Sequence, residues 1–251
     1  MKPTILICND DGIEADGIKA LTKEIRKFAE VIVAAPHTQQ SAVGHSITMA
    51  NPIRMKEVMM FKDFYGYAIE GTPADSVKLA VHTLLKDRKI DLLISGINQG
   101  SNTAINIIYS GTVSAATEGT ILGIPSIAIS LTSYTYPDFT IAAKFATKIS
   151  KAVLKNGLPR GTLLNVNIPA TKNIKGVVIT KQGKSSWDDT YEIRLDPGNR
   201  KYYWLTGSML KIDKTIEYDV KAIDENYISV TPIHYDLTDY KMYDDMKKWK
   251  L

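Results

Sequence analysis

The sequence predicts an α/β fold: a three-layer, Rossmann-like arrangement built on a mostly parallel sheet, with a C-terminal β-hairpin extension. Up to about residue 170, short apolar runs alternate with segments of helical spacing, which is typical of βαβ units. The apolar runs end in loops rich in Gly, Asp, Asn and Ser, as strands do at the carboxyl edge of such a sheet. Beyond Pro169, apolar and polar residues alternate and aromatic side chains are frequent, which favours hairpins.

The first unit is a strand, a helix and a second strand. Residues 4–8 form an apolar run that is read as a buried strand. From Ile18 to Phe28 the apolar residues are spaced for one face of a helix, and residues 31–36 form a second apolar run that ends at a proline. This order predicts parallel strands joined by a right-handed crossover.

The second unit begins with a polar loop over residues 37–44 and a stretch of short strands, with an antiparallel excursion, over residues 46–69. Residues 72–75 (Thr-Pro-Ala-Asp) predict a helix start, with Thr at the N-cap, Pro at the first helical position and Asp capping in return. A helix over residues 77–85 then leads to a third buried strand over residues 91–96.

The last regular elements follow a loop over residues 96–113 that is rich in Gly, Asn, Ser and Thr. Small residues at 114–118 predict a helix start, and residues 124–130 a fourth strand. An amphipathic helix over residues 139–154 and a strand over residues 163–168 close the α/β pattern.

Length and composition set further bounds. At 251 residues the chain is near the upper limit for one hydrophobic core, so we expect an α/β core over residues 1–170 and a hairpin-rich extension over residues 171–251, in one functional unit. The net charge of +4 favours anionic ligands, but acidic residues interrupt the basic stretch 181–201, so no nucleic-acid partner is expected. Cys8 is the single cysteine, and neither a signal peptide nor a membrane-length apolar run is present; we expect a cytoplasmic protein without a membrane partner.

Two adjacent carboxylates, Asp10 and Asp11, follow the first predicted strand. Side by side they repel each other and are costly to desolvate, unless a cation or hydrogen-bond donors compensate them. A divalent metal with oxygen ligands would explain the pair. The alternative is an Asx-turn, in which one Asp caps the following helix and the other is solvated.

Polar side chains in three loops could complete such a metal site. The loops over residues 9–13, 36–45 and 96–113 each follow a predicted parallel strand, so we expect them to converge at one edge of the sheet. Carboxylate, hydroxyl and amide oxygens select Mg²⁺, Mn²⁺ or Ca²⁺ over zinc. The candidate ligands are Asp10, Asp11, Ser41 and Asn98, with Asn102 and Asn106 nearby.

The segment Tyr109–Ser114 combines a glycine, hydroxyl side chains and a predicted helix start. Such a helix N-terminus offers N–H groups and a partial positive charge, which is an anion site and most naturally a phosphate site. The alternative is an N-cap with a tight turn. A cation beside an anion site would suit phosphoryl chemistry.

Other enzyme classes lack their signatures here. No G-x-G-x-x-G follows the first strand, and neither a G-x-x-x-x-G-K-[ST] loop nor a G-x-S-x-G elbow occurs. A dinucleotide oxidoreductase, a P-loop NTPase and a serine hydrolase are therefore not expected. Of the four histidines, His45 is the candidate for the site, and His37 is close to it in the same loop.

These motifs together resemble those of the stationary-phase survival protein (SurE) family, whose members are metal-dependent 5′-nucleotidases. The resemblance runs in register from residue 5 to about residue 170 and continues more loosely through residues 202–204 and 230–234. The motifs that carry it are Asn9–Gly12, Pro36–Ser46, Gly71–Asp75, Ser95–Gly100 and Tyr109–Ala115.

The resemblance implies a phosphatase that hydrolyses nucleoside 5′-monophosphates to nucleoside and phosphate. It implies one divalent ion per subunit, Mg²⁺ or Mn²⁺, held by Asp10, Asp11, Ser41 and Asn98. It also implies a phosphate site at Gly44, His45, Ser110, Gly111 and Thr112, with Asp10, Asp11, Asn98 and Ser110 in catalytic roles. Family members pair through their C-terminal hairpins, so a homodimer or homotetramer is expected. Tyr109 stands where the family often has His.

A phospho-receiver or other phosphate-binding signalling module is the alternative, because it too has a flavodoxin-like start with an acidic pair after the first strand. It would need a phosphoacceptor Asp at the end of a central strand, where this chain has Ser95–Asn98. It would also be about half as long.

Overall fold

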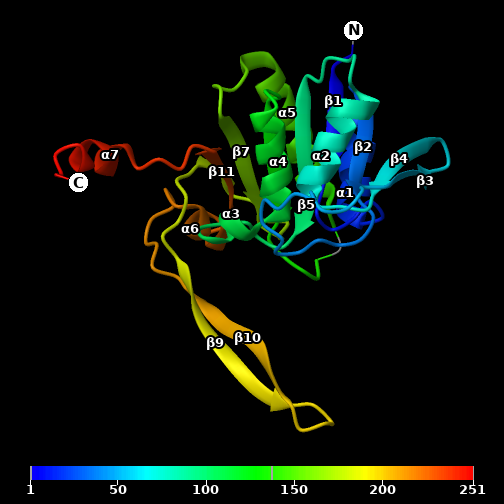
Figure 1. Ribbon diagram of the computed structural model, residues 1–251. Coiled ribbons are helices and arrows are strands. Elements are labelled where there is room, and N and C mark those ends of the chain that lie inside the picture. The colour runs from blue at the N-terminus through cyan, green and yellow to red at the C-terminus, as the bar shows by residue number, and fades with distance from the viewer. Residues whose placement is uncertain (1, 137, 251) are drawn as a thin grey trace.

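One mixed sheet runs through the part of the chain that the computed structural model describes, residues 2–136 and 138–250 (Figure 1). Its strands are β1 (Thr4–Cys8), β2 (Glu30–Pro36), β3 (Met55–Phe61), β4 (Phe64–Ile69), β5 (Leu92–Gln99), β6 (Ser126–Leu131), β7 (Thr162–Ile168), β8 (Gly176–Ile179) and β11 (Tyr227–His234). They lie in the order β3-β4-β2-β1-β5-β6-β7-β11-β8. The neighbouring strands β4, β2, β1, β5, β6 and β7 pair in parallel. At the two sides of this parallel part, β3 is antiparallel to β4 and β11 is antiparallel to β7.

Helices cover both faces of this sheet, which confirms the predicted three-layer fold. On one face, α1 (Asp16–Ile25) and α5 (Thr140–Asn156) bury apolar side chains with Ile5 and Ile7 of β1. On the other, α2 (Pro73–Leu79), its π-helical continuation η1 (Ala80–Leu84) and α4 (Gly111–Ile121) pack with Leu6 and Cys8. This alternation follows from the two-residue period of a strand that is buried on both sides. The short helices are α3 (Asn106–Tyr109), α6 (Asp219–Asp224) and α7 (Tyr240–Met246).

A local signal explains where α2 begins. Thr72 accepts a hydrogen bond from the backbone of Asp75, and the Asp75 carboxylate accepts one in return, so the predicted capping box at the start of α2 is confirmed.

Among the described residues, no helix combines the length and the apolar character that a bilayer crossing needs.

The third predicted strand is longer than the sequence indicated. We expected it to end at Gly96, but β5 continues to Gln99 through a register shift between Ser95 and Asn98. Gly96 has φ +137°, and a Cβ there would lie 2.3 Å from the carbonyl oxygen of Ile129, so only glycine fits this irregularity. As a result, Asn98 lies near the end of β5 and not in a loop.

Beyond Pro169 the chain does two different things. The strands β8 and β11 extend the main sheet beside β7, while β9 (Ser186–Leu195) and β10 (Lys201–Leu210) form a separate two-stranded hairpin that projects away from the core (Figure 1). The C-terminal α7 lies apart from that hairpin (Figure 1). The predicted hairpin extension is therefore present as one long arm, whereas β8 and β11 belong to the main sheet.

Candidate functional site

The loops that follow the parallel strands converge as predicted. Asp10 after β1, Ser41 after β2, Asn98 at the end of β5 and Ser110 before α4 line one cleft of about 800 Å³. The cleft lies beyond the carboxyl ends of the strands, where open α/β sheets place their ligands. Asp11 is beside it, and its carboxylate accepts a hydrogen bond of 3.1 Å from the backbone N–H of Gln99.

Asp10 is held from several directions. It is 6% exposed, and the Thr112 hydroxyl donates a hydrogen bond to its Oδ1. Its carbonyl oxygen accepts from the backbone of Gln40 at 2.7 Å, which joins the loop after β2 to the end of β1. A Cβ on Gly111 would lie 2.7 Å from the Asp10 Cβ, so the start of α4 needs glycine to approach this carboxylate.

Burial dominates the electrostatics of both carboxylates. It raises the pKa of Asp10 from 3.8 to about 6, with the Thr112 hydrogen bond opposing and the charge of Asp11 adding to the rise. Burial also raises the pKa of Asp11. Among the residues that the structure describes, neither carboxylate pairs with Lys, Arg or His. A buried carboxylate beside a half-buried one is unfavourable without a cation, and a bound metal ion would relieve that cost.

The other donors around Asp10 and Asp11 also fit a hard divalent cation. The Nδ2 of Asn98 donates to the carbonyl of Gly100 at 2.8 Å, which leaves its Oδ1 as the atom for a metal. Ser41 is exposed and adds a hydroxyl. Within residues 2–136 and 138–250, no group of three or more His, Cys, Asp or Glu side chains is arranged to hold a metal. An all-oxygen set with only two carboxylates fits a hard divalent cation better than it fits zinc.

The helix beside the cleft starts earlier than predicted. We expected its first turn at residues 114–118, but α4 begins at Gly111 with Ser110 as its N-cap. The Oγ of Ser110 accepts from the N–H of Val113 at 3.0 Å, so the capping alternative is correct for this side chain. The cap uses only a lone pair of the oxygen, so the hydroxyl proton is still able to bind an anion in the cleft. Sequence periodicity missed this start because the helix is made of small residues that are buried all round.

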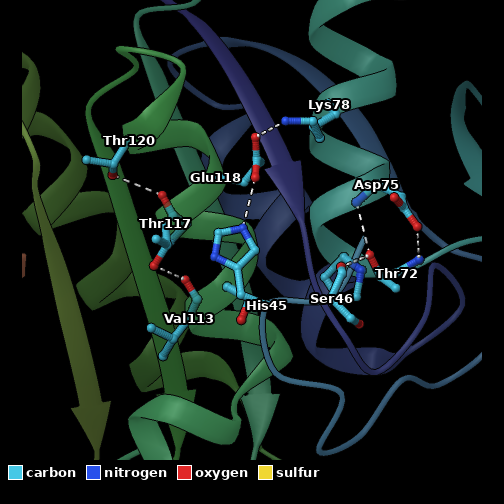
Figure 2. A network of polar contacts seen from close by, with 12 residues as sticks. His45, Ser46, Thr72, Asp75, Lys78, Val113, Thr117, Glu118 and Thr120 are labelled. Carbon is cyan, nitrogen blue, oxygen red and sulfur yellow. Dashed lines mark hydrogen bonds and ion pairs between the residues drawn. The ribbon is translucent and has the colours of Figure 1, made fainter. Parts of the chain in front are cut away.

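Gly44 and His45 are not among the residues that line this cleft. The N–H of Gly44 donates to the carbonyl of Tyr109 at 3.1 Å. Figure 2 shows His45 pointing at Glu118 on α4, with an Nε2–Oε2 distance of 2.8 Å, and Lys78 of α2 reaching the other oxygen of Glu118 at 2.7 Å. In this structure, Gly44 attaches the loop after β2 to the end of α3, and His45 attaches it to α4, whose N-terminus borders the cleft.

One wall of the cleft has no counterpart among the sequence-predicted site residues. The root of the β9–β10 hairpin lines it, together with two exposed tyrosines, one at the end of α3 and one in the loop after β6. The sequence indicated an aromatic hairpin but carried no signal that it folds against the loops at the strand ends, because that contact joins segments about 80 residues apart. The residues concerned are Ser186, Trp187, Asp189, Leu205, Thr206, Gly207, Tyr109 and Tyr134.

Comparison with known proteins agrees with this geometry. The family described as Survival protein SurE matches residues 5–189. Relatives named 5′-nucleotidase SurE include a protein of Chlorobium chlorochromatii, 49% identical over 99% of this chain and 92% of its own length, and one of Syntrophobacter fumaroxidans, 47% identical over 98% and 99%. The crystal structure of the SurE protein from Aquifex aeolicus superposes with a TM-score of 0.85 at 42% identity and covers 98% of both chains. The chain therefore belongs to the SurE family.

Proposed function

We propose that this chain is a 5′-nucleotidase, a divalent-metal-dependent phosphatase that hydrolyses nucleoside 5′-monophosphates. The observation that carries the proposal is the placement of Asp10, a buried carboxylate with a raised pKa, directly against the N-terminus of α4 in a cleft large enough for a nucleotide. The names of the relatives support the same activity.

One Mg²⁺ or Mn²⁺ ion per subunit would be held by Asp10, Asp11, Ser41 and Asn98. When bound, such an ion polarises a phosphoryl oxygen and lowers the pKa of its water. Thr112 fixes the Asp10 carboxylate through its hydroxyl, and the backbone of Gln99 fixes Asp11. These contacts prevent the two carboxylates from rotating away from each other in the absence of a ligand.

The phosphate group would lie at the N-terminus of α4. The Ser110 hydroxyl, which borders the cleft, and the amide of Gly111 in the first turn of α4 would donate to phosphoryl oxygens, and the helix dipole would add a partial positive charge. The hydroxyl of Thr112 is committed to Asp10, so we assign Thr112 to positioning that carboxylate. Gly44 and His45 act on the phosphate through the loop that they attach to Tyr109 and Glu118.

The signalling alternative is not favoured. A phospho-receiver needs a phosphoacceptor carboxylate at the end of a central strand, and the central β5 ends with the amide side chains of Asn98 and Gln99. The relatives of near-identical length carry the name of a hydrolase.

The direct test is phosphate release from AMP, GMP, CMP and UMP in the presence of Mg²⁺ or Mn²⁺. We expect continuous turnover that chelation abolishes and either metal restores. Full activity after exhaustive chelation would rule out the metal role. Stable labelling of the protein by a small phosphodonor, without turnover, would favour the receiver.

We also propose that the hairpin joins subunits into a homodimer or homotetramer in the cytoplasm. An isolated two-stranded hairpin is marginal in water, and this one exposes a run of large apolar side chains. Light scattering at micromolar concentration should show at least a dimer, and a monomer would contradict the proposal. The exposed side chains include Tyr191, Ile193, Leu195, Tyr203 and Trp204.

A further inference from the structure

The wall of the cleft opposite the metal-binding loops is built from the root of the hairpin. Trp187 and Asp189 of β9 line it, together with Leu205 and Gly207 of β10. Residues at alternate positions of a strand share a face, and cross-strand partners share it as well. Because Asp189 pairs with Gly207, no side chain stands opposite Asp189 on that face. The hairpin root therefore presents an indole and a carboxylate on the same face of β9.

Trp187 is held in place at this wall. Its indole N–H donates to Oδ1 of Asn106 on α3 at 2.7 Å, which anchors the hairpin root to the segment that leads into Ser110. The side chain is nevertheless 43% exposed, which leaves part of the ring surface to the cleft. Anchoring by the polar tip with an exposed ring is the arrangement that suits stacking of a planar ligand.

A second aromatic side chain borders the cleft next to the metal-binding end. A Cβ on Gly100 would lie 2.6 Å from the ring of Tyr134, so that ring rests against the backbone two residues beyond Asn98. Tyr134 is 79% exposed and lines the same cleft. The cleft thus changes from oxygen donors at the strand ends to aromatic surface at the hairpin.

A phosphate alone would fill only a small part of this space. At about 800 Å³ the cleft is in the range of sites for whole organic ligands. Base stacking on an aromatic side chain is a strong interaction, and a purine offers it a larger π-face than a pyrimidine does. The carboxylate of Asp189 would accept from N–H groups, which adenine and guanine present on their edges.

We propose that Trp187 is the platform on which the purine base of a nucleoside monophosphate stacks, with Asp189 accepting a hydrogen bond from the base edge. This inference rests on the proposed nucleotidase function and names its preferred substrate class. The metal end and Ser110 act on the phosphate that all monophosphates share, whereas the hairpin root distinguishes a nucleotide from a simple sugar phosphate.

The test compares AMP with ribose 5-phosphate, which has the same phosphate and sugar but no base. Trp187→Ala should raise KM for AMP about 5- to 100-fold while kcat stays near the wild-type value. KM for ribose 5-phosphate should change by no more than about twofold, the range of a surface substitution. Trp187→Phe keeps an aromatic ring but loses the bond to Asn106, so it should retain most of the preference for AMP.

Trp204→Ala is the matched control. Trp204 lies on β10 opposite Glu192, on the other face of the same hairpin, and does not line the cleft. Its removal disturbs the hairpin and its subunit contacts without touching the stacking surface. The ratio of the kcat/KM values for AMP and ribose 5-phosphate should remain that of the wild type.

A binding measurement makes the inference independent of turnover. Adenosine carries no phosphate, so it probes the base site without metal. The chain has three tryptophans, and adenosine at millimolar concentration should change the fluorescence of Trp204→Phe protein but not of Trp187→Phe protein.

Two results would overturn the proposal: equal loss for AMP and ribose 5-phosphate in Trp187→Ala, or no fluorescence response that depends on Trp187. Failure of the wild type to hydrolyse either phosphate would contradict the nucleotidase function instead. In that case the adenosine titration still decides whether Trp187 binds a base.

Discussion

The two ends of the cleft are built on different principles. At the end that we propose binds the metal, the metal-binding end, the backbone or side chains of other segments hold Asp10 and Asp11 through hydrogen bonds, and Asp10 is almost fully buried. At the hairpin end, Trp187 is attached to the core by one side-chain hydrogen bond and is nearly half exposed. The first end is part of the core, and the second is the base of an arm that leaves it (Figure 1).

The difference follows from what each end has to do. A small divalent cation and a phosphoryl group need ligands that are fixed to within a fraction of an ångström. A stacked base makes contacts over a broad ring surface, and every base has a face that can make them. Changes at the metal-binding end should therefore act on turnover and act steeply, whereas changes at the hairpin should act on substrate preference and assembly and act gradually.

The largest effect should come from Asp10→Asn. Loss of one charged ligand should lower metal-dependent turnover by ~10³-fold or more, since the ion supplies several kcal/mol of transition-state stabilisation. The metal-free variant should unfold at a higher temperature than the metal-free wild type, because a buried charge has been removed. The rise in Tm that Mg²⁺ or Mn²⁺ gives the wild type should be lost.

Asp63→Asn is the control for this change. Asp63 is an exposed partner of Arg26 at 3.0 Å, so its loss should leave both turnover and the metal-induced rise in Tm unchanged. If Asp10→Asn kept wild-type kcat, the steep response that we assign to the metal-binding end would be wrong.

Ser110→Ala should come next. Loss of one preorganised donor to the phosphoryl group typically costs ~10²–10³ in rate, and loss of the N-cap should cost about 1 kcal/mol of stability. Thr72→Ala removes the N-cap of α2 and provides a matched loss of a cap away from the cleft. Steady-state kinetics and thermal unfolding of both variants separate the two roles. Equal rates in the two variants would leave Ser110 with capping alone.

Truncation of the arm should change assembly more than chemistry. Thr190 and Thr206 face each other across the hairpin, so Asn-Gly in place of residues 191–205 would close it by a two-residue turn while keeping Trp187 and Asp189. We expect a monomer in light scattering that still hydrolyses ribose 5-phosphate. A truncated protein that remained a dimer would show that another surface joins the subunits.

The last prediction concerns how the free energy of unfolding of the metal-free protein depends on pH. The pKa of Asp10 is raised from 3.8 to about 6 in the folded protein, so its favourable contribution is present below pH 3.8 and is lost as pH rises through 6. The metal-free wild type should thus lose about 3 kcal/mol relative to Asp10→Asn over this interval. Urea unfolding at a series of pH values measures the difference. A wild type that gained stability relative to Asp10→Asn over the same interval would contradict the burial of this charge.

Much of the metal-binding end could be predicted from the sequence, because its parts are local. The run before Asp10 is apolar and short, the carboxylates follow directly, and strand ends of a parallel sheet meet at one edge. The extension of β5 to Asn98 could not be predicted, since it depends on Gly96 fitting against the carbonyl of Ile129 on a neighbouring strand. The contacts of Gly44 and His45 could not be predicted either, because their partners Tyr109 and Glu118 are distant in the chain.

By itself, the sequence determined the layers of the fold, the family and the oxygen donors of the candidate metal site. Periodicity, capping residues and adjacent charges act between neighbours along the chain, so they can be read without coordinates. Only the tertiary structure decided that the hairpin root forms a wall of the cleft and that the Thr112 hydroxyl donates to the carboxylate of Asp10. Both contacts join residues about 80 or more positions apart, and their geometry is set by how the sheet and α4 pack.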